Sequence, residues 1–205
     1  MASNDFDNRW GTDTDGEIPI ELLEHDAAIA GQAVSYEPTD PDAFRVMVRE
    51  LAIAREDYTF LDLGSGKGRV VLLAAQAGFG RVVGIEASPL LHHTACTNLR
   101  VWAQAGHGTR HIDLRSEDAA GADIPPGPCV VYLFNPFRER AMSRLLRQIR
   151  RSLQHVPRDL WLLYYNPQAR HLLESSDCLA RVTVGRGFQQ GDYEIWRSHA
   201  AFRGE

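Results

Sequence analysis

Five short apolar runs, separated by segments with helical periodicity, occupy the middle of this chain. The runs are TFLDL (59–63), RVVGIE (81–86), RHIDLR (110–115), CVVYLF (129–134) and LWLLYY (160–165). The periodicity predicts helices between them, at about 68–77, 89–105 and 138–154, and a shorter helix near 168–174. Apolar strands that alternate with helices indicate a parallel α/β sheet with right-handed crossovers and helices on both faces.

Both ends of this pattern carry further signals. Before the first strand, DPDAFRVMVRELAIA predicts a helix, because Asp40 suits the N-cap and Pro41 the first helical position. After residue 179, LARVTVGRGF and DYEIWRS are joined by a glycine-containing turn and predict a hairpin whose last strand runs antiparallel. The stretch EDAAGADIPPG (117–127) is typical of a loop. With 205 residues and no linker or repeat, we expect one globular domain.

Composition excludes several classes of protein. No apolar run approaches the roughly 18 residues that a membrane helix needs, and the polar, acidic start does not resemble a signal peptide. We therefore expect a cytoplasmic protein without a membrane partner. Cys96, Cys129 and Cys178 are far apart and form no CxxC pair, so we expect buried thiols and neither a disulfide framework nor a metal site.

Charge is distributed unevenly along the chain. Residues 1–45 hold eleven acids and two bases, whereas the remaining residues hold sixteen acids and twenty bases. The predicted helix at 138–154 carries several arginines on the face opposite its apolar residues, which we interpret as a solvated surface. Because the net charge is −5, a nucleic acid is the least favoured partner.

The stretch DLGSGKGR, residues 62–69, places glycines between a predicted strand and a predicted helix. Such a loop lets a ligand approach the backbone and offers free N–H groups at the start of a helix. A phosphate-binding GxxxxGK[ST] loop is excluded, because Gly68 follows Lys67. The dinucleotide pattern GxGxxG fits poorly, because Arg69 stands where a small residue is needed.

The remaining pattern, an acid two residues before GxGxG, resembles the first motif of the class I S-adenosylmethionine-dependent methyltransferases. The resemblance covers roughly residues 36–198 and implies a Rossmann-like, doubly wound sheet of seven strands, mostly parallel with an antiparallel C-terminal hairpin strand. It also implies S-adenosylmethionine as cofactor and S-adenosylhomocysteine as product. The order FDNRWGTDTDG (6–16), YEPT (36–39) and DLGSGKGR is similar to that of a small bacterial group within the family.

The resemblance also implies a set of cofactor-binding residues. Glu86 ends the second strand, where the family holds the ribose hydroxyls, and Asp118 stands where an acid contacts adenine, with Glu117 as the neighbouring candidate. The full expected cofactor set is Tyr36, Thr39, Asp62, Gly64, Ser65, Gly66, Gly68, Glu86, Ala87, Asp118, Ala119 and Asn135.

The lead segment, residues 1–35, is expected to precede a methyltransferase domain at 36–205. Two interpretations of the lead and its border remain open. Tyr36 and Thr39 close over the methionine end of the cofactor while Trp10 and nearby acids form a lid, or Tyr36 packs in the core and the lead is a solvated arm.

The chemistry expected at the methyl group is an in-line displacement that depends mainly on positioning. Asn135, Pro136 and Phe137 follow the fourth strand at the family's substrate-facing position and, with Tyr36, form the expected catalytic set. An asparagine acceptor and a fixed proline carbonyl suit an amino group, although NPF lacks one proline of the Asn-Pro-Pro-aromatic motif. Two interpretations of YYNP (164–167) stay open: either Tyr164 or Tyr165 orients the substrate, or the stretch only marks the end of the strand. Glu37 is a weak candidate for a general base.

We therefore expect N-methylation of a small amine-bearing molecule. A protein lysine is the alternative acceptor, since the same motif order resembles lysine methyltransferases outside the SET class. An acidic lead would attract either cation. A catalytically inactive module that only binds the cofactor is the alternative from another class.

Overall fold

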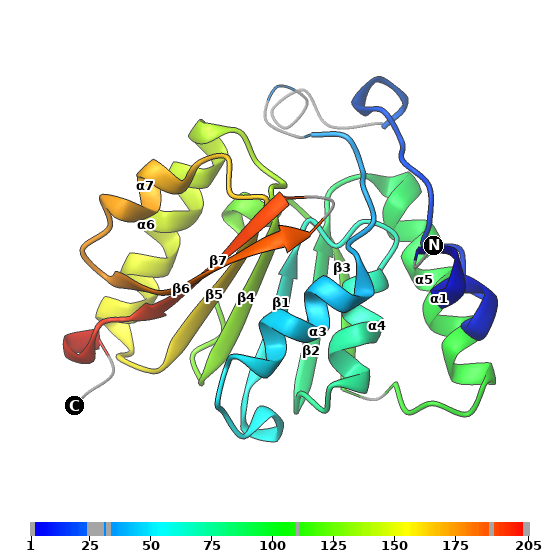
Figure 1. Cartoon of the computed structure of the whole chain (residues 1–205), viewed down its shortest axis with the longest axis horizontal. Coiled ribbons are helices and arrows are strands. Elements are labelled where there is room, and N and C mark those ends of the chain that lie inside the picture. The colour runs from blue at the N-terminus through cyan, green and yellow to red at the C-terminus, as the bar shows by residue number, and fades with distance from the viewer. Residues whose placement is uncertain (1–2, 24–30, 32–33, 110, 189–190, 203–205) are drawn as a thin grey trace.

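The protein is built around a twisted sheet of seven strands in the order β3-β2-β1-β4-β5-β7-β6 (Figure 1). The computed structural model describes residues 3–23, 31, 34–109, 111–188 and 191–202. The strands are β1 (Thr59–Leu63), β2 (Arg81–Glu86), β3 (Ile112–Ser116), β4 (Cys129–Phe134), β5 (Leu160–Tyr165), β6 (Leu179–Phe188) and β7 (Gly191–Ser198). Strands β1 to β5 are parallel, and β7 pairs antiparallel with both β5 and β6.

Helices cover both faces of this sheet. One face carries α3 (Pro41–Arg49), α4 (Arg69–Gln76) and α5 (Pro89–Gln104), and the other carries α6 (Glu139–His155), α7 (Arg170–Glu174) and the 3-10 turn η3 (Ala119–Gly121). Helix α1 (Ser3–Trp10) packs on the α3–α5 side, where Phe6 joins the core. The remaining 3-10 turns are η1 (Ile20–Leu22), η2 (Arg55–Asp57) and η4 (Ala200–Phe202).

The apolar runs form the central strands because both of their faces are covered. All six residues of β5 are buried, and neighbouring side chains point to opposite layers. Tyr164 packs with the α6 and α7 side, whereas Tyr165 packs with the α3 side. This alternation confirms the prediction that the two tyrosines face opposite sides of the sheet.

Most predicted boundaries agree with the structure. The runs at 59–63, 81–86, 129–134 and 160–165 are strands with those bounds, and Asp40 caps α3 by accepting hydrogen bonds from the backbone of Asp42 and Ala43. The third strand begins at Ile112, two residues later than predicted, and Arg110 lies outside the described residues. The loop predicted at 117–127 contains η3, a single short turn.

The N-terminal lead is an integrated part of the domain. Phe6 is only 5% exposed, and Ile18 forms an antiparallel bridge with Tyr36. The interpretation of the lead as a solvated arm is therefore wrong for the residues that the structure describes up to Leu23.

Within the described ranges, no helix has the length and apolar character needed to cross a membrane, and no cluster of potential metal ligands occurs. The three cysteines are unpaired. Cys129 and Cys178 are buried as predicted, whereas Cys96 on α5 is half-buried.

Candidate functional site

A cavity of about 970 Å³ lies at the carboxyl ends of the parallel strands. The chain leaves β1 toward β2 on one side and reaches β4 on the other, so the strand order reverses between β1 and β4. Open α/β sheets bind their ligands outside the strand ends at such a switch point. The volume is near the upper end of the roughly 300–1,000 Å³ found for ligand pockets.

Nearly all predicted site residues line this one cavity. They are Tyr36, Thr39, Asp62, Gly64, Ser65, Gly66, Glu86, Ala87, Asp118, Ala119, Asn135, Pro136 and Phe137. Gly68 is the one predicted site residue that does not line it. Gly68 caps α4 with a φ of +85°, and a Cβ there would lie 3.2 Å from the Cβ of Ala95, so this glycine serves the close packing of α4 on α5.

The first two glycines of the loop are needed because neighbouring residues lie against the backbone. A Cβ on Gly64 would be 2.7 Å from the Cβ of Pro136, and a Cβ on Gly66 would be 2.3 Å from the ring of Tyr36. Both glycines also have positive φ, which disfavours other residues. The loop after β1 therefore touches both the motif that ends β4 and the tyrosine that follows the lead.

The amides of Gly64, Ser65 and Gly66 are not free, contrary to the prediction from the position of this loop at a helix start. The N–H groups of Gly64 and Ser65 donate to the carbonyl of Ile85 at 2.9 and 3.0 Å. The N–H of Gly66 donates to Oε2 of Glu86 at 2.8 Å. At these three residues the loop therefore offers a ligand a close approach to the backbone, and the carboxylates of Asp62 and Glu86 lie beside it in the cavity wall.

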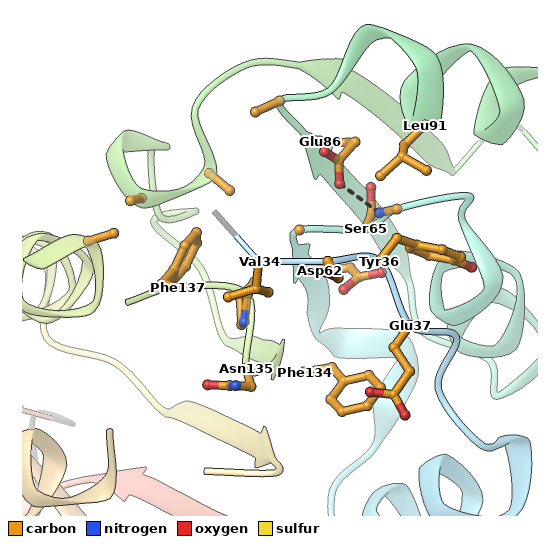
Figure 2. Close-up of a pocket in the computed structure, with 18 of the residues that line it drawn as sticks. Val34, Tyr36, Glu37, Asp62, Ser65, Glu86, Leu91, Phe134, Asn135 and Phe137 are labelled. Atoms are coloured by element: carbon orange, nitrogen blue, oxygen red, sulfur yellow. Dashed lines mark hydrogen bonds between the residues drawn. The ribbon is translucent and has the colours of Figure 1, made fainter. Parts of the chain in front are cut away.

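Glu86 ties the second strand to the glycine loop. Its Oε1 accepts a hydrogen bond from the backbone of Ser88 at 2.8 Å while its Oε2 holds Gly66 (Figure 2). Burial raises the pKa of the Glu86 carboxyl, although these backbone donors act in the opposite direction. A carboxylate oxygen has more than one lone pair, so the same group can also accept hydrogen bonds from a cis-diol.

Asp62 is a buried carboxylate with an unused oxygen. It is 3% exposed, and its Oδ2 has no hydrogen-bond partner among the described residues. Burial, and then the nearby charge of Glu86, raise the pKa of Asp62 well above its usual value. An orphaned carboxyl beside a cavity fits a ligand that brings a cation or a donor to it.

The turn after β3 forms another wall. Oδ1 of Asp118 accepts a hydrogen bond from the backbone of Ala120 at 3.0 Å, and Oδ2 forms an ion pair with Arg144 of α6. Asp118 thus fixes the turn that brings Ala119 to the cavity. Glu117, the neighbouring candidate, is exposed, lies 3.7 Å from Arg115 and is absent from the cavity wall.

The opposite end of the cavity is formed by the motif that ends β4. Asn135 has a φ of +39°, an uncommon conformation for a residue with a side chain. The hydroxyl of Tyr164 donates to its Oδ1 at 3.4 Å and accepts from the backbone of Ala169 at 3.2 Å. Figure 2 shows Phe137 and Val34 on the Asn135 side of the cavity and Glu86 on the other.

The sequence left two interpretations of the YYNP stretch open, a tyrosine that orients substrate or structural punctuation. Neither Tyr164 nor Tyr165 lines the cavity, whereas Asn166 does. Tyr164 acts on the site indirectly, through its hydrogen bond with Asn135. Glu37 lines the cavity and is exposed, and Figure 2 shows its side chain beside Phe134.

Tyr36 forms a wall of the cavity with its ring. Its hydroxyl donates to the carbonyl of Thr14 at 2.6 Å, and burial raises the pKa of this phenol above its usual value. Both facts argue against Tyr36 as a proton acceptor. Thr39 shares a hydrogen bond of 2.9 Å with the hydroxyl of Tyr132, which anchors the end of the YEPT stretch on β4.

The acidic residues of the lead bind the two cations of the glycine motif. Nζ of Lys67 donates to Oδ1 of Asp13 at 2.8 Å, and Arg69 donates through Nε to the hydroxyl of Thr14 at 2.7 Å. Arg69 is 2% exposed and lies 3.5 Å from carboxylate oxygens of Asp7 and Asp15. The lead is therefore fastened to the back of the glycine loop.

Trp10 and the nearby acids, for which a lid was one of the two open interpretations, contact other parts of the protein in this structure. The Trp10 ring packs edge-on against Trp102 and His107, each 4.9 Å away, and lines no part of the cavity. The described part of the lead that does reach the cavity is Leu23, Gly31, Val34 and Ser35.

Several cavity residues were not predicted from the sequence. Leu91 and Phe134 supply apolar walls, and Arg140 and Arg144 line the cavity from α6. No local motif marks the apolar pair. The partnership of the lead with Lys67 had a visible signal, since the only lysine of the chain lies in the glycine loop and the lead is strongly acidic.

Comparison with solved structures shows the same fold in methyltransferases. An RNA methyltransferase from Salinibacter ruber, in complex with S-adenosyl-L-homocysteine, is 24% identical, with 80% of this chain and 94% of that chain covered and a TM-score of 0.52. The mitomycin 7-O-methyltransferase is 16% identical (77% and 53% covered, TM-score 0.55). A 23S rRNA methyltransferase is also 16% identical (79% and 69% covered, TM-score 0.50).

The chain has the class I methyltransferase fold. No protein-family model matches the sequence, and no curated protein matches it significantly. The predicted fold class is therefore confirmed by structure, at sequence identities too low to carry a substrate from one protein to another.

Proposed function

We propose that this protein is an S-adenosylmethionine-dependent methyltransferase that methylates a nitrogen atom. The observation that carries the proposal is the contact between the Gly66 amide and the Glu86 carboxylate at one end of a cavity whose other end is the Asn135–Phe137 motif. The fold and the S-adenosyl-L-homocysteine complex of the Salinibacter protein support the same cofactor here.

The residues present fit that cofactor. Glu86, already fixed by two backbone donors, is suited to the ribose hydroxyls. Asp62 offers an unpartnered carboxyl oxygen to a cationic group, and Ala119 and Leu91 offer apolar surface to a base. When bound, S-adenosylmethionine supplies a methyl group that is activated by a positively charged sulfur.

The role of the acceptor end is positioning. Asn135 can hold an amino group through Oδ1, whose direction is constrained by Tyr164, and Pro136 restricts the carbonyl beside it. Phe137 provides an apolar wall that keeps water from the nitrogen lone pair. Tyr36 holds Gly66 in place and supplies the wall between the lead and the loop.

Three classes of acceptor are candidates. The sequence favoured a small amine, with a protein lysine as the alternative. The acidic lead attracts a cationic substrate less strongly than its sequence indicates, because Asp7, Asp13 and Asp15 contact Lys67 or Arg69. RNA is the third class, supported by the names of two structural relatives and by the arginines of α6 beside the cavity.

The proposal is tested by calorimetric titration with S-adenosylhomocysteine. We expect the wild-type protein to bind and Glu86→Ala to lose about tenfold or more in affinity, because a charged hydrogen-bond acceptor is removed. Glu117→Ala is the matched control, since Glu117, the acid that precedes Asp118, does not line the cavity. Absence of binding to the wild type ends the proposal.

Transfer itself separates an enzyme from a module that only binds the cofactor. A panel of small amines, lysine-bearing peptides and RNA is incubated with the protein and methyl-labelled S-adenosylmethionine. Label in any acceptor supports the enzyme. Cofactor binding without transfer to any member of the panel favours the inactive module.

A further inference from the structure

Helix α6 presents a row of arginines that begins at the cavity wall. Arg140, Arg144, Arg147 and Arg151 are spaced i, i+4, i+7 and i+11 and are all exposed. This spacing keeps them within about 60° of one helix face and extends the row over about 16 Å. Arg140 and Arg144 also line the cavity, so the row, here called the α6 arginine row, leads directly into the candidate site.

Most of this charge is not neutralised by the protein. Arg144 pairs with Asp118, but within the described ranges no ion pair involves Arg140, Arg147 or Arg151. The acid of the first turn, Glu139, faces His171 at 3.3 Å instead. Three free guanidinium groups on one helix face form a surface that attracts anions arranged in a line.

The negative net charge of the chain does not oppose this attraction as strongly as the sequence suggested. Lead carboxylates at Asp7, Asp13 and Asp15 lie within 3.5 Å of the cations Lys67 or Arg69. These acids lie on the α3–α5 side, whereas α6 covers the other face of the sheet. These three acids are therefore paired with cations on the face of the sheet opposite the α6 arginine row.

We infer that the α6 arginine row binds the phosphates of a single-stranded RNA whose base enters the cavity beside Phe137. A row of about 16 Å matches about five stacked nucleotides at 3.4 Å each. The cavity end next to the row carries an aromatic wall and the polar Asn135, which suit the stacking and edge recognition of an unpaired base. A small amine in the cavity contacts no arginine of the row beyond Arg140 and Arg144, the two that line the cavity.

A single strand is favoured over a duplex by the position of the cavity. The acceptor nitrogen has to reach the ends of the strands next to Gly64 and Pro136, inside the molecule's surface. A base in a duplex must be unpaired and unstacked before it can enter such a pocket, at a cost of a few kcal/mol. This inference rests on the proposed function and names its acceptor.

The test measures binding of a short fluorescein-labelled single-stranded RNA by anisotropy, in the presence of S-adenosylhomocysteine, over a range of salt concentrations. The variant is the double substitution Arg147→Ala/Arg151→Ala, which leaves the cavity wall intact. The matched control is Arg100→Ala, an exposed arginine on α5 without an ion pair among the described residues. We expect the double variant to bind RNA about tenfold more weakly, with a salt slope reduced by about 1.4, and the control to bind as the wild type does.

Two results would overturn the inference. One is equal RNA affinity in the wild type, the double variant and the control. The other is displacement of RNA by poly-L-glutamate of the same charge as effectively as by unlabelled RNA, which would assign the row to an acidic protein. Calorimetry with S-adenosylhomocysteine keeps this outcome separate from the proposed function, because the double variant retains cofactor affinity whether or not the row binds RNA.

Discussion

Two buried carboxylates, Asp62 and Glu86, stand at the ends of neighbouring strands but are supported in different ways. Both oxygens of Glu86 accept hydrogen bonds from backbone N–H groups, whereas Oδ2 of Asp62 has no partner in the described parts of the chain. Burial without a partner disfavours the charged form. Asp62 is therefore the residue at which protonation, fold stability and cofactor binding are most strongly linked.

The raised pKa of Asp62 predicts a specific pH dependence of stability. The folded protein holds this proton more tightly than the unfolded chain, whose pKa is near 3.8. The stabilising contribution is thus complete below that pH and is lost as the pH rises through the folded-state pKa. We expect Asp62→Asn to show a smaller decrease in unfolding free energy between acid and neutral pH than the wild type, measured by urea unfolding.

Ionisation of Asp62 should have opposite effects on fold stability and on ligand affinity, and Asp62→Asn should remove both effects. A cationic ligand group favours the ionised carboxylate, so wild-type affinity for S-adenosylhomocysteine should rise with pH, while Asp62→Asn should bind about tenfold more weakly or worse. Glu117→Gln is the control for both measurements, because Glu117 is exposed. Parallel stability curves for the wild type and Asp62→Asn would show that Asp62 is not the linked group.

At the scale of elements, the lead and the glycine loop form one structural unit. Asp7 accepts hydrogen bonds from the Thr14 backbone at 2.9 Å and from the Thr14 hydroxyl at 2.7 Å, and that hydroxyl accepts from Arg69. The carbonyl of Thr14 then holds the hydroxyl of Tyr36, whose ring lies on Gly66. A continuous set of contacts therefore connects α1 to the cavity wall.

This arrangement predicts that Asp7→Asn destabilises the fold and also weakens cofactor binding. Asp7 is 9% exposed and faces the buried Arg69, so neutralising it leaves a buried cation with less compensation, at a cost of about 1–3 kcal/mol. Urea unfolding measures the first effect and calorimetry with S-adenosylhomocysteine the second. Asp5→Asn, an exposed acid on the same helix, should change neither. Equal loss in both variants would contradict a specific role for Asp7.

The strands could be predicted from sequence because each is a nearly uninterrupted apolar run. The bounds of strand β3 were predicted least accurately, because its residues lie at the sheet edge, are only partly buried and form a weaker apolar pattern. The turn η3 was missed because it is a single turn held by Asp118, without helical periodicity. Hairpin β6–β7 followed from its glycines and β-rich segments.

The candidate site was predictable where residues follow strand ends in a recognisable motif. Parallel strands bring their carboxyl ends to one edge, so Asp62, Glu86 and Asn135 meet in one cavity as expected. Contacts between elements distant in sequence were not predictable. The acidic lead and the single lysine indicated an attraction between the lead and the glycine loop. Which acids meet Lys67 and Arg69, and the approach of Pro136 to Gly64, depend on tertiary packing that no local pattern encodes.

At the scale of the whole molecule, the cavity joins two parts of the fold that the topology separates. The cofactor end belongs to β1, β2 and the turn after β3, and the acceptor end belongs to the loop after β4 and to α6. The lead crosses from the back of the glycine loop to the cavity through Tyr36. Cofactor binding at one end of the cavity should therefore also slow hydrogen exchange in the lead.

Hydrogen exchange followed by mass spectrometry tests this connection. On addition of S-adenosylhomocysteine we expect slower exchange in residues 62–69 and 86–88, and also in residues 12–16, because Lys67 donates to Asp13 and to the carbonyl of Asp15. The β6–β7 hairpin should be unchanged, since none of the hairpin residues that the structure describes lines the cavity. In Asp7→Asn at saturating S-adenosylhomocysteine, the protection of residues 12–16 should fall while that of residues 86–88 persists. Protection confined to the strand ends in the wild type would show that the lead is a passive cover, because a ligand held by Glu86 would then leave the contacts of Lys67 and Arg69 unaltered.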